Sequence, residues 1–571
     1  MKNTSNELSL SLVWASIWSV IYACLLMLLR GPSEWLQVWA GDFDDPDTFY
    51  LLNLIWNHRQ GVPFGLTPRM VDAGGAWIHW SHVFPTLVDM LARVFAFVGI
   101  SADHSLYLSV SLWGVLPWCA LLALLPWVVP GDRIPLRTFL AYLLLCAPAV
   151  VWQLYGSPIR GTHHMLMDVL MLGAMVAYLR EWDIRWVAGL AVSSLWVSPE
   201  LFPFLLLILL LGALGGRTKD ALGIALYSAV SIVVISLFDP PYVRYGIWAP
   251  DHISLAYGVL FLMVAGVLSA MLWYPSISWW MRGGFLGVIS IVWLLIIPGL
   301  RLGIHGIVPD DLYNLWYVHV GELHETYSWP FVLVYTVGNA ITLFFGSVYL
   351  SRSRRSDDWL LMLAAWIYIA MALLHVRTVM PSMILSTIVF LRGFSMTGWG
   401  ARAACWFLGL VGLLLQFVCF DATSHQHLSE SERTNCFVDE AAPEMMQIIP
   451  ANDGLIAEMD VVPQILWWTR GAHFRVSAGP YHRDHEGMRL YYGVSHDSLD
   501  MHFVRSRALM HRYRMHYVAF CPYVLMGDMR KYQPDNGLFM QLIAGYHPSW
   551  VQNFDVGGKM LMFHLDDGHL D

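Results

Sequence analysis

Apolar residues along this chain come in runs long enough to cross a membrane. The first run, Leu8 to Leu29, has no small-residue cleavage site after it, so it predicts a retained transmembrane helix rather than a signal peptide. Further apolar segments lie near residues 104–129, 135–153, 165–179, 186–198, 200–215, 221–238, 255–274, 283–300, 330–350, 359–375, 379–396 and 402–420. Together they predict about 13 spans. Segments 186–198 and 200–215 form either two short helices or one broken helix.

The chain changes character after Asp421. Residues 422–571 are polar and contain no apolar run of membrane length. Short strand-like stretches recur there with helical patterns between them, for instance around 497–511, which predicts a soluble α/β domain. The strand-like stretches are GLIAEMD at 454–460, HFRVSAG at 473–479, YVAFCP at 517–522 and MLMFHL at 560–565. We therefore predict a polytopic α-helical membrane protein: a membrane domain over 1–421, with a long first outer loop at 30–103, and a C-terminal soluble α/β domain over 422–571.

Basic residues alternate between the predicted loops in a way that orients the chain. With a cytoplasmic N-terminus, the inner loops carry Arg133, Arg137, Arg180, Arg185, Arg217, Lys219, Arg282, Arg352, Arg354, Arg355 and Arg402. The short outer loops carry at most one basic residue each, namely Arg160, Arg244, Arg301 and Arg377. Because positive charge favours the cytoplasmic side, this asymmetry predicts that the first long loop and residues 422–571 face outward.

Composition agrees with a membrane protein and excludes one class of partner. Hydrophobic residues make up 57% of the chain and charged residues 13%, against roughly 45–50% and about 25% in soluble domains. The net charge of −9 argues against nucleic acid, whose phosphates require a basic face. Cys436 and Cys521 are the two cysteines of the outer domain, where an oxidising compartment permits a disulfide. The sequence alone leaves open whether they form one.

Four aspartates follow the first apolar run, in GDFDDPDTFY at 41–50. The simplest interpretation is that Asp42 and Asp44 are solvated loop charges and that Asp47 caps the next helix. That helix has an apolar face, however, which would hold Asp45 and Asp47 against the membrane surface. Carboxylates held there are costly unless they are paired or bound to a metal. Asp45 and Asp47 are therefore candidate catalytic residues.

Other polar side chains stand out in apolar surroundings of the predicted outer face. GGAWIHWSHVFP at 74–85 combines His79, Trp80 and His82, which are either an interfacial belt or a surface that contacts substrate. YGSPIRGTHHMLMD at 155–168 places His163 and His164 after Arg160. Neutral imidazole suits Mn²⁺ or Zn²⁺ better than Mg²⁺, and adjacent histidines point in different directions, so one of the two is the expected ligand.

Further candidates lie near the later spans. Glu200, between two apolar runs in WVSPELFPF, must be paired, protonated or face a polar cavity; a helix N-cap is the simpler alternative. Fixed positive charge on the outer face would suit an anionic group such as a phosphate; Arg377 at the end of MALLHVRT is best placed for this, and Arg160 and Arg244 are further candidates. The long loop 301–329 around Trp316 would suit a gate. Substrate contacts are expected from Trp316 and, in the outer domain, from Tyr481, His482 and Arg483.

The positions of these motifs resemble those of the GT-C glycosyltransferases, which include the catalytic subunits of oligosaccharyltransferases and lipid-linked aminoarabinose and mannose transferases. The resemblance covers the topology of the whole chain. It implies a sugar transferase, of hexosyl or pentosyl type, with a polyprenyl-phosphate donor in the membrane and a glycan, lipid or protein acceptor. Asp45 and Asp47 would activate the acceptor or bind a metal, Glu200 would contact the acceptor, and Arg377 would hold the donor phosphate.

The chain also departs from that family. Oligosaccharyltransferases carry an acidic metal-binding pair where this chain has His163 and His164, which leaves open whether a divalent cation (Mn, Mg or Zn, on Asp45 and one histidine) is needed. The Trp-Trp-Asp-Tyr-Gly acceptor motif is absent, and Trp467-Trp468-Thr469-Arg470 is a superficial echo of it. Protein N-glycosylation is therefore disfavoured, and a transferase acting on an envelope glycan or lipid of a bacterial inner membrane is expected. A secondary transporter or a non-catalytic envelope assembly protein are the alternatives.

Overall fold

A computed structural model describes most of the chain. The described residues are 8–29, 32–41, 43, 46–71, 75–77, 81–145, 163–239, 248–249, 251–296, 308, 311–313, 315, 330–353, 355–395, 403–411, 414, 436–477, 484–497, 503–522, 534–546 and 549–566. The chain divides into two compact units. The membrane unit comprises residues 1–42, 80–301 and 322–421, and the sheet unit comprises residues 43–79, 302–321 and 422–571.

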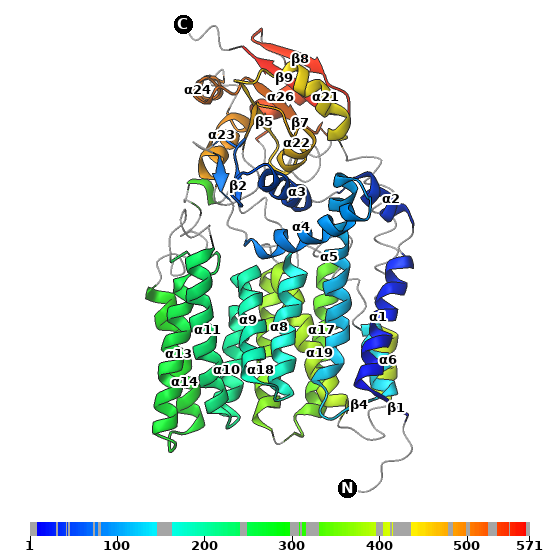
Figure 1. The fold of residues 1–571 in the computed structure, drawn as a ribbon, viewed down its shortest axis with the longest axis vertical. Coiled ribbons are helices and arrows are strands. Elements are labelled where there is room, and N and C mark those ends of the chain that lie inside the picture. Colours follow the sequence, from blue (N-terminus) through cyan, green and yellow to red (C-terminus); the bar gives the residue numbers. More distant parts are fainter. Residues whose placement is uncertain are drawn as a thin grey trace. The chain divides into compact units, whose positions relative to one another are not determined.

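The membrane unit is a bundle of apolar helices (Figure 1). Its described helices are α1 (Leu12–Leu29), α2 (Pro32–Ala40), α4 (Val83–Phe97), α5 (Ala102–Leu124), α6 (Leu136–Leu145), α8 (His163–Leu179), α9 (Ile184–Val197), α10 (Phe202–Leu214), α11 (Thr218–Phe238), α13 (Leu255–Trp273), α14 (Trp279–Ile296), α17 (Pro330–Leu350), α18 (Ser356–Leu374) and α19 (Val379–Ser395). Three short 3₁₀ helices join them: η1 (Leu125–Val128), η2 (Pro199–Leu201) and η6 (Val376–Thr378). Strands β1 (Ser9–Ser11) and β4 (Arg133–Pro135) pair antiparallel beside α1 and α6.

The predicted membrane class is confirmed, but the count of about 13 spans is not. Within the described residues, five helices are long and apolar enough to cross a membrane: Ala102–Val128, Thr218–Phe238, Leu255–Trp273, Ser356–Leu374 and Val376–Ser395. Other apolar helices are shorter, including α9 and α10. These two are separate helices joined by η2, which decides between the two interpretations of this region.

Glycines allow α17 and α19 to approach closely. A Cβ atom added to Gly346 would lie 2.8 Å from the backbone nitrogen of Phe390, and one added to Gly393 would lie 2.5 Å from the carbonyl oxygen of Gly346. Any larger residue at either position would push the two backbones apart. Small residues at helix contacts in a membrane gain packing that lipid cannot supply.

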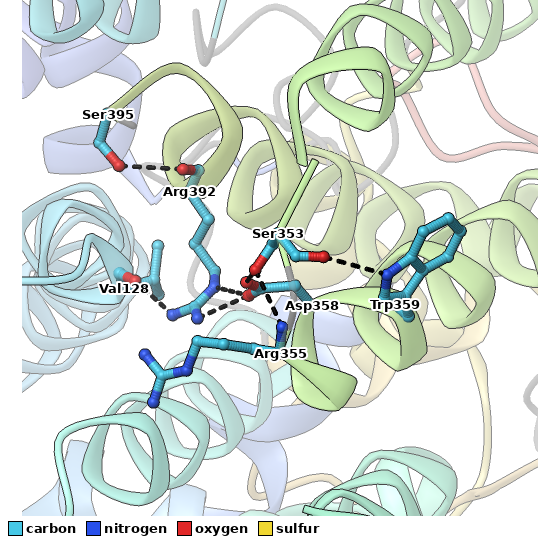
Figure 2. A network of polar contacts seen from close by, with 7 residues as sticks. All are labelled: Val128, Ser353, Arg355, Asp358, Trp359, Arg392 and Ser395. Carbon is cyan, nitrogen blue, oxygen red and sulfur yellow. Dashed lines mark hydrogen bonds and ion pairs between the residues drawn. The ribbon is translucent and has the colours of Figure 1, made fainter. Parts of the chain in front are cut away.

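A buried ion pair ties the last turn of α19 to the first turn of α18 (Figure 2). Nη2 of Arg392 lies 2.6 Å from Oδ1 of Asp358, and Nε donates to the same oxygen at 2.8 Å. Nη1 of Arg392 donates to the carbonyl oxygen of Val128 in η1, and the hydroxyl of Ser353 donates to Oδ2 of Asp358. The two charged side chains are 4% and 0% exposed, so each relies on the other for compensation.

The sheet unit is built on a mixed five-stranded sheet in the order β6-β5-β7-β9-β8. Its strands are β5 (Gly454–Ala457), β6 (Arg475–Val476), β7 (Tyr517–Phe520), β8 (Val551–Asp555) and β9 (Leu561–Leu565). Strand β5 is parallel to β6 and β7, whereas β9 is antiparallel to β7 and β8. Helices α21 (Val438–Ile448), α22 (Val462–Trp468), α23 (His485–Ser495), α24 (Val504–Tyr513) and α26 (Leu538–Ile543) accompany it. The predicted soluble sheet region is thus confirmed.

Residues of the first outer loop are part of this sheet unit. Helix α3 (Pro46–Arg59) contacts α22, and the Asn53 side chain donates to the carbonyl oxygen of Pro463 at 2.9 Å. Beyond α3, the short strands β2 (Leu66–Thr67) and β3 (Ala76–Trp77) pair antiparallel. Arg69 donates to the carbonyl oxygens of Thr469 and Phe474 and to the Thr469 hydroxyl. The unit is therefore assembled from distant parts of the chain, three segments in all.

The outer-domain cysteines form a disulfide. Cys436 precedes α21 and Cys521 follows β7, and their Cα atoms lie 5.8 Å apart. This decides a pairing that the sequence left open. The helix predicted around 497–511 is displaced, since α24 begins at Val504 and ends at Tyr513.

Candidate active site

Three short segments of the membrane unit bring its polar side chains together. Helix α8 begins at His163, η2 joins α9 to α10, and η6 joins α18 to α19. Ser198 is extended because the following Pro199 disfavours helical geometry before it, and this ends α9 and exposes Glu200 in η2. In the same way, an extended His375 ends α18 and places Arg377 in η6.

Arg377 connects the other two segments. Its Nε lies 3.0 Å from Oε2 of Glu200, and its Nη2 donates to Nε2 of His164 at 3.3 Å. Nδ1 of His164 lies 4.0 Å from the same Glu200 oxygen, while the Ser198 hydroxyl donates to Oε1 of Glu200 at 3.1 Å. Glu200, His164 and Arg377, each proposed separately from the sequence, thus form one cluster.

The cluster fixes the protonation state of His164. A guanidinium group carries only donors, so Nε2 of His164 must accept the hydrogen bond from Arg377. The proton of a neutral imidazole then resides on Nδ1, the nitrogen that faces Glu200. His164 is 5% exposed, which also favours the neutral ring next to a permanent positive charge.

Other side chains surround this cluster. The rings of His163 and His164, the first two residues of α8, lie 4.0 Å apart. The Phe84 ring lies 6.5 Å from the His163 ring, which brings the start of α4, preceded by His82, to the start of α8.

Sequence reasoning missed Asp168, which belongs to the same surroundings. It lies four residues after His164 and therefore on the same face of α8. The side chain is 1% exposed, and neither carboxyl oxygen has a hydrogen-bond partner within the described part of the chain. Its signal in the sequence is an acidic residue inside an otherwise apolar helix, which marks functional positions in membrane proteins.

The fold around this cluster is shared with solved structures. The Archaeoglobus fulgidus oligosaccharyltransferase in its apo form aligns with a TM-score of 0.62 at 14% identity, over 98% of this chain and 75% of that one. Archaeal oligosaccharyltransferase AglB from the same organism, in complex with an inhibitory peptide and a dolichol-phosphate, gives 0.59 at 12% identity over 98% and 74%. The chain has the fold of these oligosaccharyltransferases. No family model and no curated protein sequence matches it.

A third structure bears on the expected metal. The Archaeoglobus fulgidus enzyme in complex with Zn and sulfate aligns with a TM-score of 0.60 at 12% identity, over 97% of this chain and 73% of that one. In the described part of this chain, no three His, Cys, Asp or Glu side chains gather as metal ligands would. Nε2 of His164 is also engaged by the Arg377 guanidinium, which repels a cation. Asp45, the carboxylate of the predicted metal site, lies outside the described residues, so a cation on Asp45 and a histidine stays a prediction.

The remaining predicted residues are divided between the described and undescribed parts of the chain. Asp47 lies in the first turn of α3, in the sheet unit. The other candidates lie outside the described residues: Asp45, His79, Trp80, Arg160, Arg244, Trp316, Tyr481, His482 and Arg483. Their roles stay predictions.

The sheet unit holds two carboxyl groups that sequence reasoning also missed. Glu458 and Asp460 follow strand β5, at the carboxyl end of the parallel part of the sheet. Burial, with the neighbouring Asp460 second, raises the pKa of Glu458 well above its ordinary value. Burial raises the pKa of Asp460 to about 6. Asp460 is only partly buried, so it can change charge near neutral pH while remaining in contact with solvent.

Proposed function

We propose that this membrane protein is a glycosyltransferase of the GT-C type that moves a sugar from a polyprenyl-phosphate donor to an acceptor on the outer face of the membrane. One observation carries the proposal: Arg377, Glu200 and His164 converge at one end of a bundle whose fold is that of an oligosaccharyltransferase. A membrane-embedded cation beside a carboxylate and an imidazole is suited to hold a phosphate while a proton moves nearby.

Arg377 is proposed to hold the donor phosphate. Its planar guanidinium can grip two phosphate oxygens at once, and it counters the negative charge that develops as the sugar leaves. Arg160 and Arg244 remain candidates for additional contacts.

An apolar groove supports a lipid-linked donor. It lies between α10, α13, α14 and α18, has a volume of about 280 Å³, and is lined by side chains such as Pro203, Leu206, Leu210, Gly287 and Tyr368. Pro203 is only three residues from Glu200 along the chain, so the groove begins next to the cluster. A polyprenyl chain lying in this groove would bring its phosphate to Arg377.

The acceptor side is proposed from the sequence. Asp45 would remove the proton of an acceptor hydroxyl, with Asp47 in support, because a sugar hydroxyl is a poor nucleophile until it is being deprotonated. Glu200 would hold the acceptor. A divalent cation on Asp45 and a histidine stays a prediction, and none of these steps depends on it. The acceptor is an envelope glycan or lipid, and the location a bacterial inner membrane with the C-terminal domain in the periplasm.

A secondary transporter is the second candidate. The interruption between α9 and α10 at Glu200, together with the buried Asp168, resembles the broken helices and intramembrane carboxyls of transporters. The transporter proposal predicts uptake of substrate into proteoliposomes without formation of a glycosidic bond.

Reconstitution tests the proposal. Purified protein in proteoliposomes should transfer labelled sugar from a polyprenyl-phosphate donor to envelope glycolipid extracted from a deletion strain. Asp45→Asn should lower the rate about 10²- to 10⁴-fold, as expected for loss of a general base. Asp89→Asn on α4, where Asp89 pairs with Arg93, is the matched control and should retain activity. Uptake without transfer would favour the transporter, and full activity in Asp45→Asn would remove the role assigned to that residue.

A further inference from the structure

Arg377, which is proposed to hold the donor phosphate, already contacts a carboxylate of the protein itself. Arg377 presents its side-on edge, Nε and Nη2, to the cluster: Nε faces Oε2 of Glu200 and Nη2 donates to His164. This is the edge that grips two oxygens of a carboxylate or a phosphate in parallel. A phosphate cannot bind to it in that way while Glu200 and His164 keep their positions.

The pair is built so that a ligand could separate it. The side chains of Arg377 and Glu200 are 31% and 33% exposed, although the Nε atom of Arg377 is itself buried. An exposed ion pair contributes little to stability, and its separation is therefore easy. Glu200 would not be left without a partner, since the Ser198 hydroxyl donates to its other oxygen, Oε1.

We propose that Glu200 is a stand-in for the donor phosphate, and that binding of the donor displaces its carboxylate from Arg377. This inference rests on the proposed function, because it takes Arg377 as the phosphate site. The phosphate of a lipid-phosphate-sugar donor is a diester with one negative charge and two free oxygens, as in a carboxylate, so it can take the same guanidinium edge.

The displacement gives the reaction an order. Before the donor binds, Glu200 is neutralised by Arg377 and is not available to an acceptor. After the donor binds, the released carboxylate can accept a hydrogen bond from the acceptor's nucleophilic group. Glu200 is therefore available to the acceptor only in protein molecules that have already bound the donor.

A binding experiment tests this directly. Farnesyl phosphate is a short lipid phosphate, farnesol is its counterpart without the phosphate, and inorganic phosphate lacks the lipid. Binding of each to the detergent-solubilised full chain would be measured by calorimetry for the wild type, Glu200→Gln, Ser198→Ala, Arg377→Ala and the control Asp89→Asn. Glu200→Gln should bind farnesyl phosphate about two- to tenfold more tightly, since a neutral amide no longer competes for Arg377.

The other measurements identify the cause. Ser198→Ala removes one hydrogen bond to Glu200 and should not weaken farnesyl phosphate binding, which would be the opposite of the effect expected for Glu200→Gln. The affinity for farnesol should not change in any variant. Inorganic phosphate should show the same direction with weaker binding, and a gain confined to inorganic phosphate would indicate a free-phosphate site and overturn the donor assignment. Unchanged or weaker farnesyl phosphate binding in Glu200→Gln, with loss in Arg377→Ala, overturns the stand-in role and leaves the phosphate site intact. Full binding in Arg377→Ala overturns the phosphate site as well.

Discussion

Two arginine–carboxylate pairs stand near opposite ends of α19, and they differ in surroundings rather than in chemistry. Arg377 precedes the helix and meets Glu200, whereas Arg392 lies in its last turn and meets Asp358. About 13 residues of helix, or roughly 20 Å, lie between the start of α19 and Arg392. The Arg392 pair is almost fully buried and shares its hydrogen bonds with Val128 and Ser353 (Figure 2). The Arg377 pair is about one-third exposed and contacts an imidazole.

Burial determines what each pair can do. A buried pair cannot exchange partners, because every lost contact leaves a charge without compensation. A part-exposed pair can release one partner for a ligand at little cost. The same two residue types therefore form a structural clamp at one end of the bundle and a candidate binding site at the other.

The comparison first requires that the two ends face opposite sides of the membrane. Alkaline phosphatase fused after Asp421 should be fully active, whereas the same enzyme fused after Trp182, beside Arg180 at the clamp end, should be inactive. The expected difference is all or none. The reverse pattern would place the Arg377 cluster in the cytoplasm and would remove the proposed reaction with it.

Neutralising the clamp should have the largest effect on stability. Asp358→Asn leaves the Arg392 guanidinium buried without its counter-charge, and we expect a loss of about 3–5 kcal/mol of unfolding free energy. The midpoint of thermal unfolding in detergent measures this. Glu200→Gln, the matched change at the other end, should alter stability by less than about 1 kcal/mol. Equal losses in both variants would show that the two pairs do not differ in kind.

Arg377 variants should alter activity and leave stability almost unchanged. Arg377→Ala should lower kcat/KM for the lipid-phosphate donor roughly 10- to 100-fold, as expected for loss of charge-assisted hydrogen bonds. Arg377→Lys should have a smaller but clear defect, since an ammonium group supplies a point charge without the fork.

The lysine variant decides between two roles. If Arg377 only anchors its helix near the headgroups, lysine should serve equally well, because its long side chain reaches the same depth. Arg93→Lys on α4, whose arginine is 67% exposed, is the control and should behave as the wild type.

The smallest effect is expected at Asp460, a carboxyl group of the sheet unit that belongs to neither arginine–carboxylate pair. The pKa of Asp460 is raised to about 6 by burial, so its neutral form is favoured in the folded state. Its contribution to stability is complete below the unfolded value near 3.9 and is lost as pH rises through about 6. Asp460→Asn should therefore flatten the dependence of unfolding on pH between 4 and 6, by about 1–3 kcal/mol. An unchanged pH profile would show that the pKa of Asp460 is not raised in the folded protein.

The sequence could predict polar residues in apolar surroundings but not their partners. Glu200, His164 and Arg377 each stood out because a charged or imidazole group is costly in a membrane segment and usually has a function there. Their contact could not be predicted, because 213 residues separate His164 from Arg377 and nothing local encodes the pairing.

The clamp and one strand were missed for a related reason. Arg392 lies inside an apolar segment and was counted as part of a span, so the ion pair with Asp358 had no visible signal. Strand β8, Val551–Asp555, is largely exposed and polar, and its sequence VQNFD lacks the apolar pattern that identified β9. Patterns identify buried strands well and exposed edge strands poorly.

Because the sheet unit is assembled from distant segments, its folding is delayed while the chain is being synthesised. The side chain of Asn53 bonds the carbonyl oxygen of Pro463, 410 residues later, so the first outer loop must wait for the last part of the chain before it can fold. At about 5–20 residues per second, ribosomes need roughly 20–80 s to make the intervening sequence. During that time α3 would be on the membrane surface with its apolar face uncovered, and a chaperone or the lipid itself would have to shield it. If a ribosome stopped before Pro463, the bundle would be complete but the first long loop would remain unfolded, with its apolar face exposed. Quality-control proteases would recognise such an exposed loop.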